Sequence, residues 1–297
     1  MEILESSLFL WGLVLGGVCL AAISGLFANR RDAQPLQIGG ILIAVASALA
    51  FSLGDEHSTL VWVAIGIVFL LTFGAEAIGA PAHITAIASL PGAVVMAMAA
   101  PADPAWFRLL VIAAIPVGGY LIDDFETRYA VRGLGVLFFG LAVAGTFLAV
   151  PDTELARAMV GVCFPIMFLA WPRVKISLGV SGAYMAMAVF SLSTTAGGLG
   201  RSASAIGAMA CLGFLVMEPL AVRMLPRLAL LPRSLQTTAE AAVLAALPQA
   251  VLVFVSSRVA GPLDSVLQSF AVVTILFALS FLLLLWVDRN RVPELDN

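Results

Sequence analysis

The chain has 297 residues, of which 62% are hydrophobic and only 11% are charged. A water-soluble domain carries about a quarter charged residues, so this composition excludes a soluble globular protein. Fifteen Lys and Arg against eighteen Asp and Glu give a net charge of -3, which leaves no basic surface for nucleic acid. The cysteines Cys19, Cys163 and Cys211 lie far apart in apolar runs and indicate neither a metal site nor a disulfide.

Apolar stretches long enough to form membrane helices fill most of the chain. Crossing about 30 Å of hydrocarbon takes roughly 20 mostly apolar residues. About eleven stretches approach this length, at Ser7–Phe27, Ile38–Leu53, Leu60–Phe73, Ile84–Ala99, Trp106–Ile122, Val131–Val150, Leu155–Trp171, Ile176–Thr195, Ala203–Leu220, Thr238–Ser256 and Val266–Val287. No loop between them is long enough for a soluble domain. The sequence therefore predicts an all-α, multi-pass integral membrane protein, with residues 1–297 forming a single transmembrane domain.

The basic residues predict which side of the membrane each loop faces, because cytoplasmic loops are enriched in Lys and Arg. If the N-terminus is outside and the C-terminus inside, most of the fifteen Lys and Arg fall on the inside. The inside set is Arg30, Arg31, Arg128, Arg132, Arg173, Lys175, Arg223, Arg227, Arg233, Arg289 and Arg291, and the outside set is Arg108, Arg157, Arg201 and Arg258. We therefore expect an N-out, C-in topology.

The strongest polar cluster follows the fifth predicted span, where Asp123, Asp124 and Glu126 stand at the inner boundary. Carboxylates this close repel one another unless a cation or an arginine neutralises them. Magnesium takes one or two carboxylates and shares its other positions with water and substrate phosphate. Asp123 and Glu126, three residues apart, share a helical face and are a candidate magnesium pair. The alternative is an acidic helix end satisfied by Arg128 and Arg132.

Two further features lie on the predicted inner face. The glycine pair Gly39 and Gly40 begins the second span, either as a plain helix start or to let the backbone approach a ligand phosphate. Glu76 stands at the inner end of the third span, where it either solvates the helix end or faces a substrate.

The segment between the seventh and eighth spans combines two cations with a turn of small residues. Arg173 and Lys175 precede Gly179, Ser181 and Gly182. Backbone amides at a helix start, together with cations, can bind an anion. The same residues also fit a close helix contact beside a positively charged membrane anchor. The residues alone leave both interpretations open.

Taken in chain order, these segments resemble the polyprenyl-phosphate N-acetylhexosamine-1-phosphate transferases, the MraY/WecA superfamily. Pro35 with Gly39-Gly40 resembles the family's proline and glycine pair after the first helix. Gly74-Ala75-Glu76 falls where the family has an Asp-Asp pair, and Leu121 to Glu126 falls at its N-x-x-N-x-x-D-G-x-D-G. Phe164 to Gly182 is similar to the stretch ending in G-D-S-G, and Met217 to Arg227 resembles the segment that follows it.

This resemblance implies an enzyme of the bacterial inner (cytoplasmic) membrane, with a UDP-sugar and a polyprenyl phosphate as substrates and Mg2+ as cofactor. In the family, magnesium neutralises the sugar diphosphate, the lipid phosphate attacks the sugar-linked phosphorus, and UMP leaves. Carried over to this chain, the resemblance assigns catalysis to Asp123, Asp124 and Glu126, metal binding to Asp123 and Glu126, and substrate binding to Gly39, Gly40, Glu76, Arg173, Lys175 and Ser181.

The sequence also departs from the family pattern at the positions that carry charge. Ala75-Glu76 replaces the aspartate pair, Val117 and Tyr120 replace the two asparagines, and Val180, which cannot bind magnesium, replaces the aspartate of G-D-S-G. These losses support a second hypothesis, a catalytically inactive relative that binds a lipid phosphate or serves as a scaffold subunit with membrane-protein partners. A third, a transporter, would need ionisable residues deep in the membrane, of which Glu218 is one of few.

Overall fold

The computed structural model describes most of the chain as helix. The described residues are 7–27, 36–52, 58–100, 105–129, 134–149, 154–170, 175–195, 209–224 and 249–256, with isolated positions between 268 and 282. The named helices are α2 (Ser7–Phe27), α3 (Gly39–Ser52), α4 (Ser58–Ala77), α5 (Ala82–Ala88), α6 (Leu90–Ala99), α7 (Trp106–Tyr129), α8 (Leu134–Ala149), α9 (Glu154–Ala170), α10 (Val180–Thr195) and α12 (Phe214–Met224). Among the described residues, extended pairing is limited to one isolated parallel bridge between Leu36 and Ile176.

Several of these helices have the length and composition of membrane spans. Among the described residues, four stretches are long and apolar enough to cross a membrane. They are Ser7–Leu26, Thr59–Ala77, Ala82–Ala99 and Trp106–Arg128. The predicted fold class is therefore confirmed at the level of an all-helical chain with several candidate spans.

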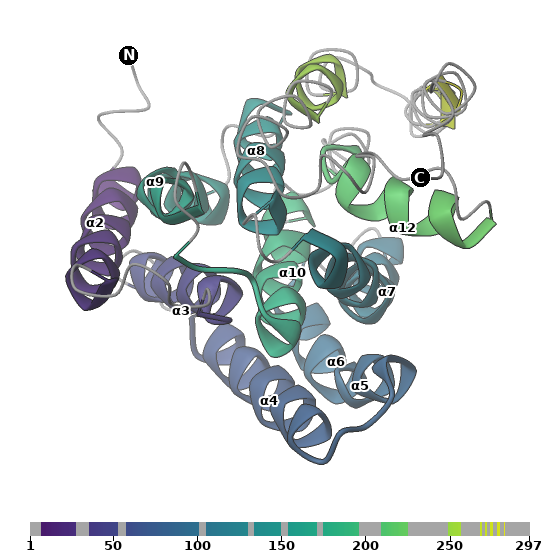
Figure 1. Cartoon of the computed structure of the whole chain (residues 1–297), viewed down its shortest axis with the longest axis horizontal. Helices are drawn as coiled ribbons and strands as arrows, with labels where there is room; N and C mark the ends of the chain where they lie inside the picture. The colour runs from purple at the N-terminus through teal and green to yellow at the C-terminus, as the bar shows by residue number, and fades with distance from the viewer. Residues whose placement is uncertain are drawn as a thin grey trace, which may run out of the picture.

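Helix α10 lies at the centre of the arrangement and packs against α3, α4, α7 and α9 (Figure 1). Every residue from Ser181 to Thr195 is buried. Its buried hydroxyls bond back to the helix, as when Ser191 Oγ donates to the Ala188 carbonyl at 3.0 Å. Hydrogen bonds of this kind satisfy the hydroxyls of Ser191, Ser193, Thr194 and Thr195, which allows that end of α10 to be buried on all sides.

Helices α2 and α9 approach each other closely through glycine. A Cβ placed on Gly12 would overlap the Ala158 carbonyl, and one placed on Gly161 would overlap the Phe9 carbonyl. Contact between helix backbones of this kind is typical of membrane proteins, where small residues allow dispersion contacts along the whole interface. The first described helix is thus held by a helix that follows it by more than a hundred residues.

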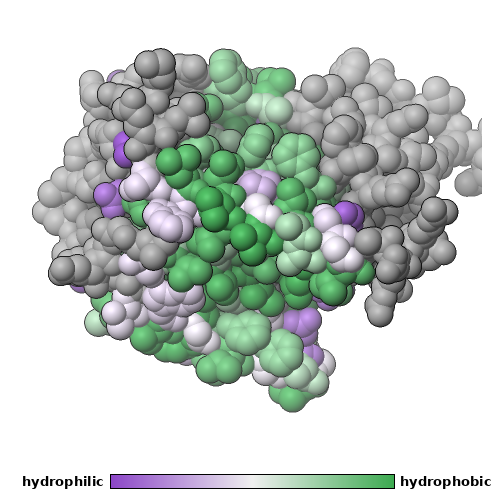
Figure 2. Space-filling model, turned by 90° about the vertical axis from the view of Figure 1, so that its left-hand side faces the viewer, coloured by the Kyte–Doolittle hydropathy of each residue, from purple (hydrophilic) through white to green (hydrophobic). Residues whose placement is uncertain are grey.

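The outward side of α2 carries large apolar side chains. Figure 2 looks at the side of the molecule where α2 lies and shows a largely hydrophobic surface. Leu10, Trp11, Val14, Val18 and Leu26 on α2 are all between 45% and 64% exposed. A surface of this kind is stable against lipid hydrocarbon and unfavourable against water.

Three predicted spans differ from the helices observed. The fourth is divided at Ser89 into α5 and α6, where Pro91 in the first turn of α6 lacks an N–H for the preceding helix. The fifth continues to Tyr129, so the acidic cluster lies on α7 itself. The ninth is interrupted at residues 211–213 before α12. Of the last two predicted spans, mainly residues 249–256 are described, as helix.

Candidate functional site

The beginnings of α3 and α10 are joined by backbone hydrogen bonds. Leu36 N–H donates to the Lys175 carbonyl at 2.9 Å, and Ser177 N–H donates back to the Leu36 carbonyl at 2.9 Å. Gly39 N–H continues the pattern by donating to the Ser177 carbonyl at 2.8 Å. These bonds bring two segments that the sequence placed on the inner face into direct contact.

The glycine pair at the start of α3 packs against this backbone. A Cβ on Gly40 would overlap the Gly182 carbonyl, and a Cβ on Gly39 would lie 2.7 Å from the Ser177 carbonyl oxygen. Gly179, with φ of 76°, supplies the left-handed turn before α10. Both predicted phosphate-binding glycines thus make contacts between two protein segments that require glycine.

Glu126 fastens α7 to the segment that leads into α10. Its side chain is buried, and Oε1 accepts a hydrogen bond from the Leu178 N–H at 2.7 Å. Oε2 lies against Gly135, where a Cβ would overlap it. The carboxylate that the sequence assigned to magnesium is therefore enclosed by protein groups.

Asp124 is neutralised by two arginines. Arg128 Nη2 lies 2.8 Å and Arg223 Nη2 lies 3.1 Å from the same oxygen, Oδ2. The Arg223 guanidinium also lies over the Tyr120 ring, 4.4 Å from its centroid. This agrees in part with the alternative in which arginines satisfy the cluster, while Arg132 lies outside the described residues. Two guanidinium groups therefore share one carboxylate, and Asp123 stands close enough to Asp124 to interact with it electrostatically.

Asp123 and Glu76 form the remaining acidic pair, between α4, α7 and α10. Glu76 Oε2 accepts a hydrogen bond from Ser181 Oγ at 2.8 Å, which brings together two residues predicted for substrate binding. Asp123 is 9% exposed and interacts electrostatically with Glu76 and with the phenol of Tyr184. The ring of Tyr184 is fully buried, and its hydroxyl has no hydrogen-bond partner among the described residues.

As magnesium ligands, the carboxylates of Glu76 and Asp123 are better suited than the predicted pair of Asp123 and Glu126. Magnesium binds through one or two carboxylates and completes its shell with water and phosphate oxygens. Glu76 and Asp123 supply that number from two helices, whereas Glu126 is buried and already accepts the Leu178 N–H on one oxygen. Within the described part of the chain, no three His, Cys, Asp or Glu residues gather closely enough to hold a metal by themselves. A magnesium ion held by these two carboxylates would complete its shell with water and phosphate oxygens.

The two predicted cations are placed differently from the carboxylates. Lys175 Nζ donates to Ser24 Oγ on α2 at 3.0 Å, which ties the segment before α10 to α2. Arg173 lies outside the described residues. Of the predicted substrate-binding residues, the structure thus brings Glu76 and Ser181 into contact and places Lys175 against a different helix.

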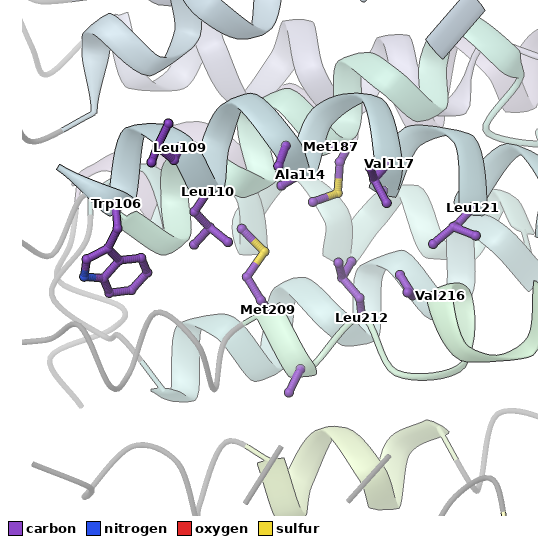
Figure 3. Close-up of a pocket in the computed structure, with 13 residues that line it drawn as sticks. Trp106, Leu109, Leu110, Ala114, Val117, Leu121, Met187, Met209, Leu212 and Val216 are labelled. Atoms are coloured by element: carbon purple, nitrogen blue, oxygen red, sulfur yellow. The ribbon is translucent and has the colours of Figure 1, made fainter. Parts of the chain in front are cut away.

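An apolar groove runs along α7 between that helix, α10 and the segment 209–216 (Figure 3). Its volume is about 540 Å³, within the range of sites that hold small molecules. It is lined by Trp106, Leu109, Leu110, Ala113, Ala114, Val117, Gly118, Leu121, Met187, Met209, Ala210, Leu212 and Val216. Among these, Leu109 and Val117 are 66% and 58% exposed, so the groove opens at the outer surface of the bundle.

The groove leads toward the two arginines that share Asp124, here called the guanidinium pair. On α7, Leu121 lines the groove and Asp124 follows it within one turn. On α12, Val216 lines the groove and Arg223 follows it after about two turns. The ion pair between Asp124 and Arg223 joins the two helices there. The arrangement is thus apolar along its length, with an arginine–carboxylate cluster beyond one end.

The sequence did not predict the groove, the shared ion pair or Tyr184. Groove residues such as Ala114 and Gly118 recur at helical spacing on α7, but that signal also describes an ordinary helix contact. Arg223 is ninety-nine residues from Asp124, and no local pattern links them.

The fold and the groove define the class as an α-helical protein with several candidate membrane spans, a lateral apolar groove and, farther along the same two helices α7 and α12, an arginine–carboxylate cluster. No protein-family model matches the chain, and no curated protein is significantly similar to it.

Proposed function

We propose that the protein binds a polyprenyl phosphate in the bacterial cytoplasmic membrane, with the isoprenoid chain in the apolar groove and the phosphate at the guanidinium pair. The observation that carries this proposal is the groove along α7, which is open at the surface and whose lining residue Leu121 stands one turn before Asp124, the carboxylate shared by Arg128 and Arg223. The family resemblance of the inner-face segments supports the same class of ligand.

Both ends of such a lipid have matching protein chemistry. The groove lining is almost wholly apolar, so an isoprenoid chain gains contacts there without leaving polar groups unpaired. Arginine binds phosphate through charge-assisted, often bidentate hydrogen bonds. Among the residues that the structure describes, the buried Nη1 of Arg128 has no hydrogen-bond partner, so it is a donor available to a phosphate oxygen that reaches it.

A second candidate function is sugar-1-phosphate transfer from a UDP-sugar to that lipid, as the family resemblance implies. The observation that favours it is the pair of carboxylates Glu76 and Asp123, next to Ser181 and Tyr184. This pair would hold Mg2+ together with the sugar diphosphate, and the metal would neutralise the phosphate charge during transfer. If the protein lacks this activity, it is a lipid-phosphate-binding relative or a scaffold subunit for membrane-protein partners.

The proposed topology has about eleven spans with the N-terminus outside and the C-terminus inside. In that orientation the guanidinium pair and the Glu76–Asp123 pair face the cytoplasmic leaflet, where UDP-sugars would be available.

Lipid binding is tested with purified full-length protein in nanodiscs, comparing undecaprenyl phosphate with undecaprenol by native mass spectrometry. We expect the phosphate to bind more tightly than the alcohol, and Arg223→Gln to remove most of that difference. Arg108→Gln, an exposed arginine at the opposite end of α7, is the matched control and should leave it unchanged. Equal binding of phosphate and alcohol by the native protein would refute the proposal.

Occupancy of the groove is tested by filling it. Ala114→Phe places a ring among the groove residues and should weaken binding of both lipids. Ala22→Phe, at an exposed position on α2, is the control for adding a phenylalanine to a lipid-facing surface. Unchanged binding of both lipids in Ala114→Phe would show that the isoprenoid chain does not bind in the groove.

The transferase is tested by incubating protein, undecaprenyl phosphate, Mg2+ and several UDP-sugars, and measuring UMP release. Activity should disappear in Asp123→Asn and in Glu76→Gln, and should require the metal. Absence of UMP with every donor, together with retained lipid binding, would support the non-catalytic alternative.

A further inference from the structure

The segment that forms one side of the groove is an interrupted helix. Met209, Leu212 and Val216 line the groove on both sides of the interruption (Figure 3). At its centre, Gly213 has φ of 48°, in the left-handed region that favours glycine. A bilayer offers no water to backbone groups that lose their helical partners. The interruption therefore needs other partners from within the protein.

The interruption releases one backbone donor. In a continuous helix the Phe214 N–H would donate to the Ala210 carbonyl, four residues earlier. That carbonyl instead accepts the Gly213 N–H at 3.0 Å. Phe214, the first residue of α12, is thereby left with an N–H that has no partner in its own segment.

The interruption also releases one backbone acceptor. The Cys211 carbonyl would accept the Leu215 N–H in a continuous helix. The Leu215 N–H instead donates to the Leu212 carbonyl at 3.0 Å. One backbone donor and one backbone acceptor on the same turn therefore lack the partners that a continuous helix would give them.

A single buried side chain satisfies both groups. Gln249, fully buried in the segment 249–256, accepts the Phe214 N–H on Oε1 at 2.9 Å. Its Nε2 donates to the Cys211 carbonyl at 3.1 Å and lies 3.4 Å from the Leu212 carbonyl. A primary amide carries the donor and the acceptor of a peptide group, so it can replace both helical partners.

We infer that Gln249 is a positioning residue for the groove: its amide holds the helix interruption at residues 211–213 and thereby fixes the wall formed by Met209, Leu212 and Val216. The residue itself does not line the groove, so its effect on a ligand is indirect. The effect on lipid binding rests on the proposed function, whereas the effect on the interruption does not.

The role of Gln249 in holding the interruption is tested by hydrogen exchange of the full-length protein, measured at the Phe214 amide. In the native protein this amide should be protected, although a turn precedes it. Gln249→Met keeps the length of the side chain and removes both hydrogen bonds, and should speed exchange at Phe214 by about tenfold or more. Leu252→Ala, a buried neighbour of Gly213, is the control for loosened packing and should not single out Phe214.

The ligand arm measures undecaprenyl phosphate binding in the same variants. We expect roughly tenfold weaker binding in Gln249→Met, and a smaller change in Leu252→Ala at equal thermal stability. An unprotected Phe214 amide in the native protein would overturn the inference, and so would unchanged exchange at this amide in Gln249→Met. If Gln249→Met does not fold, the exchange rate of the Phe214 amide in the native protein still decides. If the native protein binds no lipid, the proposed function fails, and exchange still decides the role of Gln249.

Discussion

The carboxylate of Glu126 and the backbone N–H of Leu178 form a 2.7 Å hydrogen bond across fifty-two residues of sequence. This bond joins α7 to the turn before α10, the helix around which α3, α4, α7 and α9 pack. A carboxylate beside other carboxylates would suggest metal binding from sequence alone, yet here it orders the centre of the fold. The site chemistry therefore depends on Glu126 through the position of α10.

Replacing Glu126 should affect stability according to whether an acceptor remains. Glu126→Ala leaves the Leu178 N–H buried without a partner and should cost about 2 kcal/mol or more. Glu126→Gln keeps an oxygen for that N–H and should cost less. Thermal unfolding of the purified variants in one detergent measures both. Equal unfolding temperatures for the native protein and Glu126→Ala would contradict the assigned role.

The contact between α3 and α10 should not tolerate a methyl group. Gly40→Ala would push against the Gly182 carbonyl, and overpacking of this kind costs about 1–3 kcal/mol. The control is Gly66→Ala on α4, where an added Cβ meets nothing within 4 Å. It should be neutral or slightly stabilising, because alanine is the better helix former. A Gly40→Ala protein as stable as Gly66→Ala would show that the two helices are farther apart.

Removing Asp124 should strengthen the binding of an anionic lipid. Asp124→Asn leaves both guanidinium groups of the pair without their shared carboxylate. Because these side chains are a quarter or more exposed, screening limits the gain in affinity for undecaprenyl phosphate to roughly fivefold. Titrations at two salt concentrations should show the gain shrinking at high salt. Weaker binding in Asp124→Asn than in the native protein would count against a phosphate at the guanidinium pair.

The proposed topology predicts the side on which reporters appear. A reporter fused after Arg31 should be cytoplasmic, and one fused after Gly54 should be external. Alkaline phosphatase, active outside, and green fluorescent protein, fluorescent inside, provide complementary readouts at each position. An external signal after Arg31 would reverse the orientation assigned to every loop.

The positions of the described helices could largely be predicted, because a run of apolar residues is a local signal with a fixed length scale. Helix α2 has the predicted bounds, Ser7–Phe27, and α8 and α9 differ from prediction by a few residues. The breaks at Ser89 and at residues 211–213 could not be predicted from hydropathy, since the apolar runs continue across them. The second break depends on Gln249, which is distant in sequence.

The candidate site could be predicted only in part. Glu76 and Ser181 were both expected at one site, and they form a hydrogen bond across 105 residues. The partners of Asp124 and Glu126 depend on how the helices pack, and charge pattern along the chain does not encode that packing. The same limit applies to the groove, whose walls come from three separate parts of the chain.

The glycine contact between α2 and α9 has a consequence for how the molecule is assembled during synthesis. The ribosome makes α2 early, but the backbone surface that receives it exists only once α9, ending at Ala170, has been translated. Until then α2 contacts lipid or the insertion machinery, since membrane helices form first and associate afterwards. Substitutions at Gly12 or Gly161 should therefore act only after α9 has been made, leaving the insertion of α2 intact and exposing an incompletely packed chain to quality-control proteases.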